Sequence, residues 1–243
     1  MLELRRFTPA RVGLERAGNA IGTRELLAFQ LAHARARDAV HGPFDTGALA
    51  TEIEAAGMQT LAVASAARDR PEYLRRPDLG RRLDGASRRA VGETGGPWDV
   101  VFVVADGLSP LAVQTQAAAL LRAVAERLDR AEWRIGPVAI ASQGRVALGD
   151  EIGEAMGAAL TVMLVGERPG LSAADSMGVY LTWSPRAGRT DAERNCISNI
   201  RAEGLSTGAA CELLVFLMRE SRRRCLSGVA LKAGAVPGII REP

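Results

Sequence analysis

Short apolar runs alternate with helix-type segments from residue 60 onward, and this alternation limits the possible folds more than any other feature of the sequence. Five of the runs have the length and composition of β-strands, at residues 60–65, 99–106, 137–142, 159–166 and 178–183. Several are apolar on both faces, as is typical of strands covered by helices on two sides. Strands joined by helices favour right-handed crossovers. The sequence therefore predicts an α/β fold with a doubly wound, mostly parallel sheet.

The part of the chain before residue 60 has a different, helical pattern. Thr23 is a candidate cap for a helix over residues 24–40, and a second helix over residues 46–57 is expected to stop at its final glycine. We therefore predict a helical N-terminal region at residues 1–57, followed by the α/β domain at residues 58–243.

The composition excludes several classes of protein. The three cysteines of this 243-residue chain are widely spaced and form no CxxC pair, which argues for a reducing compartment and against a zinc site. A net charge of +3 and an aromatic content of 4% do not favour nucleic-acid binding. The sequence has neither an apolar stretch of membrane-spanning length nor the apolar core of a signal peptide. We therefore expect a soluble, intracellular protein with no nucleic-acid or membrane partner.

Three loops follow predicted strands, at residues 106–109, 142–145 and 166–170. Ligands of open α/β sheets bind beyond the carboxyl ends of the strands, so these loops are candidates for one shared site. Each contains glycine, and the alternative is that they are ordinary turns. The third loop is unusual because Glu167 and Arg168 stand at the mouth of an apolar strand, where a plain turn needs neither charge.

A convincing set of acid–base residues is missing from the sequence. His33 and His41 are the only histidines and lie in or near the first predicted helix, so no Ser–His–Asp or Cys–His arrangement is supported. No glycine fingerprint of a dinucleotide or nucleoside triphosphate site is present. Three glycines at four-residue spacing (Gly149, Gly153 and Gly157) allow two interpretations, tight packing on the sheet or a bare face for a flat ligand or a partner.

Long ordered blocks of the sequence resemble one family. The blocks include "VFVVADGLSPLAV", "GRVALGDEIGEAMGA" and "VGERPGLSAADSMGVYLTWSPRAGRTDAERNCISNIRAEGLS", and the resemblance extends from about residue 8 to residue 232. They are similar to the small (light) subunit of ethanolamine ammonia-lyase. The resemblance implies a Rossmann-like domain that helps to bind adenosylcobalamin. It also implies that a large subunit carries the catalytic residues for converting ethanolamine to acetaldehyde and ammonia, so the small subunit alone is inactive.

The resemblance also implies specific residues and partners. It places cofactor contacts at Val146 in "GRVALGD", Glu167 in "GERPG" and Cys196 in "ERNCISN", with no catalytic or metal-binding residue in this chain. Glu167 is expected to accept hydrogen bonds from corrin amides, and Arg168 either holds Glu167 or a partner carboxylate or is a surface residue. Cys196 has the alternative of being a small buried thiol.

The expected assembly is a hetero-oligomer with six copies of each subunit. Its expected location is the cytoplasm, or a bacterial microcompartment if the host builds one, although the short N-terminus leaves packaging in doubt. The alternative from another class is a stand-alone α/β binding or sensor module for a small polar ligand. A nucleotide-dependent oxidoreductase or transferase is disfavoured by the absent glycine fingerprint.

Overall fold

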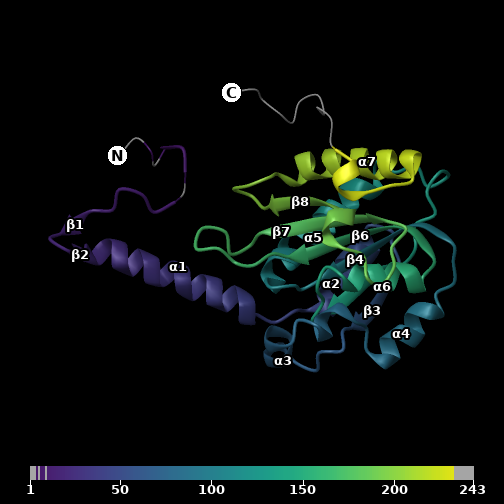
Figure 1. Ribbon diagram of the computed structural model, residues 1–243, viewed down its shortest axis with the longest axis horizontal. Helices are drawn as coiled ribbons and strands as arrows, with labels where there is room; N and C mark the ends of the chain where they lie inside the picture. Colours follow the sequence, from purple (N-terminus) through teal and green to yellow (C-terminus); the bar gives the residue numbers. More distant parts are fainter. Residues whose placement is uncertain (1–3, 5, 9, 233–243) are drawn as a thin grey trace.

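A mixed β-sheet forms the body of the protein in the computed structural model, which describes residues 4, 6–8 and 10–232 (Figure 1). Within these residues the sheet has six strands, in the order β3-β5-β4-β6-β7-β8. They are β3 (Thr60–Ala64), β4 (Trp98–Ala105), β5 (Val138–Ser142), β6 (Ala158–Gly166), β7 (Met177–Trp183) and β8 (Arg194–Ile200). The first four pair in parallel, whereas β7 and β8 are antiparallel to their neighbours. A small hairpin, β1 (Arg16–Ala17) and β2 (Ala20–Ile21), precedes the sheet.

The five predicted strands are confirmed, but the parallel arrangement applies only to β3, β4, β5 and β6. Residues 167–176, between β6 and β7, form no helix. A parallel pairing needs a long crossover connection, so β7 returns antiparallel to β6. The edge strand β8 was not predicted, because its sequence "RNCISNI" places polar residues among the apolar ones on a half-exposed strand.

Helices cover both faces of the sheet. They are α1 (Thr23–His41), α2 (Thr46–Ala55), α3 (Arg70–Arg75), α4 (Gly85–Gly92), α5 (Pro110–Ala125), α6 (Leu148–Ala155) and α7 (Thr207–Arg224). Helices α2, α5 and α7 pack on one face, and α4 and α6 pack on the other. Strand β4 supplies alternate residues to the two cores: Val100, Phe102 and Val104 to one, and Val101, Val103 and Ala105 to the other. The α/β class is therefore confirmed, and both faces of the central strands are apolar for the predicted reason.

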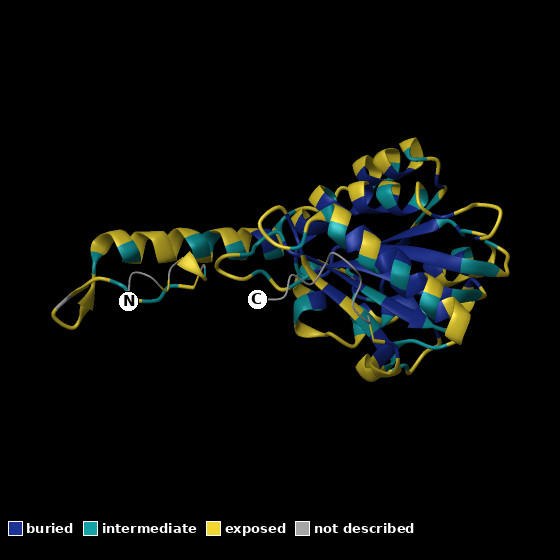
Figure 2. Ribbon diagram, turned by 90° about the horizontal axis from the view of Figure 1, so that it is seen from above, coloured by how far each residue is buried: buried dark blue, intermediate teal, exposed yellow. Residues whose placement is uncertain are grey.

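Helix α1 projects away from this body (Figures 1 and 2). Only Ala39, near its C-terminal end, is buried, whereas Leu27 is 58% exposed and Leu31 is 53% exposed. Helix α2 behaves differently, since its Leu49 and Ile53 belong to the core that also contains α5. The expected N-terminal helices are therefore both present, but only α1 stands apart from the sheet.

The three loops at the carboxyl ends of the parallel strands meet around one buried carboxylate. Asp106 Oδ1 accepts a hydrogen bond from the Gly144 N–H at 3.0 Å, and Oδ2 pairs with Arg70 Nη1 at 3.1 Å. The Leu108 N–H donates to the Gly166 carbonyl at 2.9 Å. A Cβ at Gly166 would lie 2.1 Å from the Ser109 carbonyl oxygen, so only glycine permits this approach.

Burial raises the pKa of Asp106 to about 6, against the opposing effect of the Arg70 guanidinium. The carboxyl group is therefore largely ionised above pH 7 and forms a buried ion pair there. We expect Asp106→Ala to lower the free energy of unfolding at pH 7.5 by about 3 kcal/mol, because Arg70 and the loop N–H groups lose their partner. Urea denaturation measures the change. The control is Asp78→Ala, which removes an exposed ion pair with Arg76 and should cost less than about 1 kcal/mol. Equal losses would contradict a special role for Asp106.

Candidate functional site

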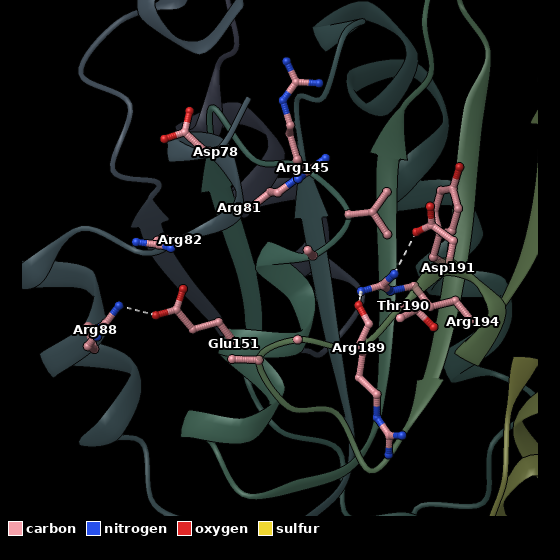
Figure 3. Close-up of a pocket in the computed structure, with 15 residues that line it drawn as sticks. Asp78, Arg81, Arg82, Arg88, Arg145, Glu151, Arg189, Thr190, Asp191 and Arg194 are labelled. Carbon is pink, nitrogen blue, oxygen red and sulfur yellow. Dashed lines mark hydrogen bonds and ion pairs between the residues drawn. The ribbon is translucent and has the colours of Figure 1, made fainter. Parts of the chain in front are cut away.

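A cavity of about 1030 Å³ opens on the sheet face that carries α4 and α6 (Figure 3). On this face the two helices pack against β3, β4 and β6, while Tyr180 of β7 and Cys196 of β8 remain partly open to solvent. The cavity lining comes from four places: Asp78, Arg81 and Arg82 with Arg88 of α4; residues 145–147 with Glu151 of α6; Tyr180; and residues 187–191 with Arg194. The site is thus an open cavity beside α6. We use the word shelf for this cavity together with the adjoining surface of β7 and β8 that carries Glu167, Tyr180 and Cys196.

The space between the three predicted loops is not this cavity. The loops converge as predicted, but Arg70 and Tyr73 fill the space between them. The Arg70 guanidinium donates to the Gly107 carbonyl at 2.8 Å, and the Tyr73 hydroxyl donates to the Gly144 carbonyl at 3.2 Å. The polar groups of the loops therefore bond to other residues of the protein, and the cavity lies instead on the sheet face that carries α4 and α6.

The three predicted contact residues lie around Tyr180. Val146 lines the cavity directly, as does Tyr180. Cys196 is the register partner of Tyr180 across β7 and β8, and the Tyr180 hydroxyl donates a hydrogen bond to its sulfur. Glu167 approaches from the end of β6: a Cβ at Gly178 would lie 2.9 Å from Glu167 Oε1 and 3.3 Å from Tyr180 Cε2. The glycine at position 178 thus leaves room for both side chains.

Glu167 uses only one of its two carboxylate oxygens within the described residues. Oε2 accepts hydrogen bonds from the Ser176 hydroxyl and from the Asn199 N–H, the latter at 3.2 Å. These contacts tie the end of β6 to β8 and orient the side chain, leaving Oε1 as an acceptor. Arg168 forms no ion pair with Glu167 or with any other carboxylate in the part of the chain that the structure describes, so the expectation that Arg168 holds Glu167 was wrong.

Tyr180 and Cys196 are both protonated at neutral pH, and because Cys196 is exposed on the edge strand, the alternative of a small buried thiol was wrong. Desolvation raises the pKa of the Tyr180 hydroxyl, and the nearby thiol and Glu167 carboxylate add to this effect. Desolvation also raises the pKa of the Cys196 thiol, partly offset by the hydrogen bond from Tyr180. The cluster therefore presents a neutral hydroxyl and a neutral thiol rather than a nucleophile. Sequence reasoning missed Tyr180, although it is the one hydroxyl-bearing aromatic residue in the predicted strand 178–183.

A buried ion pair forms the wall of the cavity on the side of β8. Arg194 of β8 pairs with Asp150 of α6, and both side chains are less than a twentieth exposed. Arg194 also pairs with Asp191 at 2.8 Å and donates to the Arg189 carbonyl at 2.8 Å (Figure 3). The pair links α6 to β8 and fixes the loop between β7 and β8. Its two members are far apart in the sequence, and no local pattern pointed to it.

The glycine spacing in α6 is explained by packing. A Cβ at Gly153 would lie 1.9 Å from Thr161 Oγ1, and one at Gly149 would lie 3.2 Å from the Met163 Cβ. Gly157 has a positive φ of 67° at the turn that follows the helix. The interpretation as a bare face for a ligand or partner was therefore wrong, because β6 occupies that face.

Both histidines lie on α1, as the sequence predicted, but His41 follows Val40, whose carbonyl accepts a hydrogen bond from the Arg70 that fills the space between the loops. Within residues 4, 6–8 and 10–232, no group of three or more His, Cys, Asp or Glu side chains is arranged to bind a metal ion. The helices of this same part of the chain include none with the length and apolar character needed to span a membrane.

The Tyr180–Cys196 hydrogen bond predicts a pH-dependent reactivity. Because desolvation raises the pKa of the Cys196 thiol, iodoacetamide should modify this exposed cysteine slowly at neutral pH and faster as the pH rises. Tyr180→Phe should move the Cys196 reaction to still higher pH, since the hydrogen bond favours the thiolate. Mass spectrometry over a pH series measures this. Tyr73→Phe is the control, and an equal shift in both variants would contradict the assignment.

Comparison with known proteins identifies the relatives of this chain. The family model described as "Ethanolamine ammonia-lyase light chain (EutC)" matches residues 1–232. The ethanolamine ammonia-lyase small subunit of Ralstonia nicotianae is 55% identical over 236 residues, which cover 96% of this chain and 87% of the relative. The small subunit of Azotobacter vinelandii is 56% identical over 234 residues, which cover 95% and 87% respectively. The chain therefore belongs to the ethanolamine ammonia-lyase light chain family.

Proposed function

We propose that this chain covers adenosylcobalamin in an ethanolamine ammonia-lyase whose large subunit carries the catalytic residues for forming acetaldehyde and ammonia. The observation that carries the proposal is the open shelf on β7 and β8, where Glu167, Tyr180 and Cys196 lie together beside Val146. The shelf has hydrogen-bonding groups, but the Tyr180 hydroxyl and the Cys196 thiol are protonated at neutral pH, and both histidines of the chain lie on α1. Such a surface suits binding and orientation of a cofactor that supplies the chemistry itself.

The residues present fit this cofactor. Adenosylcobalamin, when bound, supplies the radical chemistry, and its corrin ring carries neutral amide side chains around an apolar face. Glu167 Oε1 is an acceptor for such an amide, and its orientation is set by the Oε2 contacts to Ser176 and Asn199. Tyr180 and Val146 offer partly exposed apolar surface on the same shelf. Cys196 contributes a neutral thiol next to the Tyr180 hydroxyl. The parallel strands with helices on both faces support the Rossmann-like classification.

Helix α1 supports a partner subunit over a stand-alone binding module. Leu27 and Leu31 are one helical turn apart on α1, and both are more than half exposed. Phe29 is also exposed on this helix. Exposed apolar side chains grouped on one projecting element are typical of an interaction surface. The proposed occupant of this surface is the large subunit, in an assembly with six copies of each chain in the cytoplasm or in a bacterial microcompartment.

Reconstitution tests the proposal directly. The purified chain, the large subunit of the same organism and adenosylcobalamin should together form acetaldehyde from ethanolamine, whereas this chain with cofactor alone should form none. Leu27→Glu combined with Leu31→Glu should abolish co-elution with the large subunit on size exclusion, because charges would face an apolar interface. Gln30→Glu, on the same helix, should leave co-elution unchanged. Turnover by this chain alone would contradict the division of roles.

Substitution of Glu167 tests more directly whether the shelf contacts the cofactor. Glu167→Ala should weaken cobalamin binding to the assembled complex by about 1.5–3 kcal/mol, the usual range for a hydrogen bond to a charged group. Absorbance titration measures the affinity. Ser176→Ala removes an orienting contact while keeping the carboxylate, and should cause a smaller loss. Glu203→Ala, an exposed carboxylate after β8, is the control and should have no effect. Unchanged affinity in Glu167→Ala would make Glu167 a purely structural residue.

A further inference from the structure

The arginines of the cavity fall into two groups. Three have carboxylate partners within the protein: Arg88 pairs with Glu151, Arg189 with Glu193, and Arg194 with Asp150 and Asp191. The other three, Arg81, Arg82 and Arg145, form no ion pair with any carboxylate among the described residues. Asp78, which lies at the same edge, is already paired with Arg76 at 2.7 Å. One end of the cavity therefore has an unbalanced positive charge.

Arg81 and Arg145 are held next to each other by the backbone. The Arg145 N–H donates to the Gly80 carbonyl at 2.8 Å, which joins the turn after β5 to the 3-10 helix η2 (Leu79–Arg81). A Cβ at Gly80 would lie 2.9 Å from Tyr73 Cε2 and 3.1 Å from Arg145 Cγ, so the two segments are in close contact. Figure 3 shows Arg81 and Arg145 at one end of the cavity, away from the Arg88–Glu151 pair.

Arg145 is oriented without a neutralising partner. Its guanidinium lies over the Tyr73 ring, 4.5 Å from the ring centroid, and Nη2 donates to the Tyr73 carbonyl at 3.2 Å. Its buried Nε atom has no hydrogen-bond partner in the structure. A buried donor of this kind costs stability unless something accepts from it. The stacking and the Nη2 hydrogen bond thus hold the guanidinium in place, and no carboxylate among the described residues neutralises its charge.

An oxyanion suits this end of the cavity. Guanidinium groups match the geometry of phosphate and carboxylate oxygens, and their bonds to these groups are stronger than neutral hydrogen bonds. Residue 146, next along the chain from Arg145, is a proposed contact of the cofactor, so an anion here would belong to the same ligand. The anionic group of cobalamin is the phosphodiester of its nucleotide tail.

We propose that Arg81 and Arg145, assisted by Arg82, bind the phosphodiester of the cofactor's nucleotide tail. This inference rests on the proposed function and adds which part of the cofactor lies in the cavity. The corrin amides are then recognised at Glu167, and the charged tail is recognised at the arginine end, on opposite sides of Val146 and Tyr180.

Cobinamide separates these two contacts, because it keeps the corrin ring but lacks the phosphodiester, ribose and base. Absorbance titrations of the assembled complex with cobalamin and with cobinamide compare the affinities without any assay of activity. Arg81→Gln should weaken cobalamin binding at least about ten-fold, the effect expected for losing a charged hydrogen bond, and should leave cobinamide binding unchanged. Arg81 is exposed and its side chain forms no hydrogen bond or ion pair with another described residue, so this variant should fold normally. Arg145→Lys should show a partial loss for cobalamin alone.

The matched control is Arg88→Gln, which removes a paired arginine from the same cavity and should leave both affinities unchanged. Equal losses for the two corrinoids, or no loss for either, would overturn the assignment of the phosphodiester. Loss of the large subunit from the Arg81→Gln complex would instead assign these arginines to a partner carboxylate. If the unmodified complex binds neither corrinoid, the proposed function itself fails, an outcome distinct from a failure of the arginine variants alone.

Discussion

The buried carboxylate of Asp106 determines how the carboxyl edge of the sheet is used. It accepts from the Gly144 N–H and from the Arg70 guanidinium, and it thereby joins the loop after β4 to the loop after β5 and to the start of α3. In many α/β proteins this edge is open and binds a ligand. Here Arg70 and Tyr73 occupy it, so the open surface lies on the face of β7 and β8 instead.

The antiparallel half of the sheet explains why this face is open. A parallel strand needs a crossover helix, and each crossover adds cover to a face of the sheet. Strands β7 and β8 follow β6 without such crossovers, and α7 packs on only one of their faces. Tyr180 and Cys196 on the other face are left partly exposed. A sheet face with hydrogen-bonding and apolar side chains but no helix is suited to being covered by a ligand and a partner subunit.

The charged groups of the shelf are of two kinds: some stabilise the protein, and others are available to a ligand. The Arg194–Asp150 pair is balanced and buried, and it stabilises the loop that walls the cavity. Glu167 has one oxygen engaged and one available. The raised pKa values of Tyr180 and Cys196 keep both groups protonated at neutral pH, so neither is poised there as a base or a nucleophile. In the proposed function this chain positions a ligand, and the proposed role of the unpaired arginines is to select for an anionic group.

Local patterns in the sequence were enough for the strands β3 to β7 and for the position of Glu167 at the end of β6, because periodicity and turn chemistry act over a few residues. They also predicted that His33 and His41 would lie in or near the first helix. The tertiary structure alone decided that β8 forms the edge, that Asp150 meets Arg194, and that Ser176 and Asn199, rather than Arg168, orient Glu167. Each of these depends on strand register, and register brings together residues that are separated by long stretches of chain. Tyr180 shows the difference most clearly: the sequence places it in a strand, but only the pairing of β7 with β8 sets it between Cys196, Glu167 and the cavity.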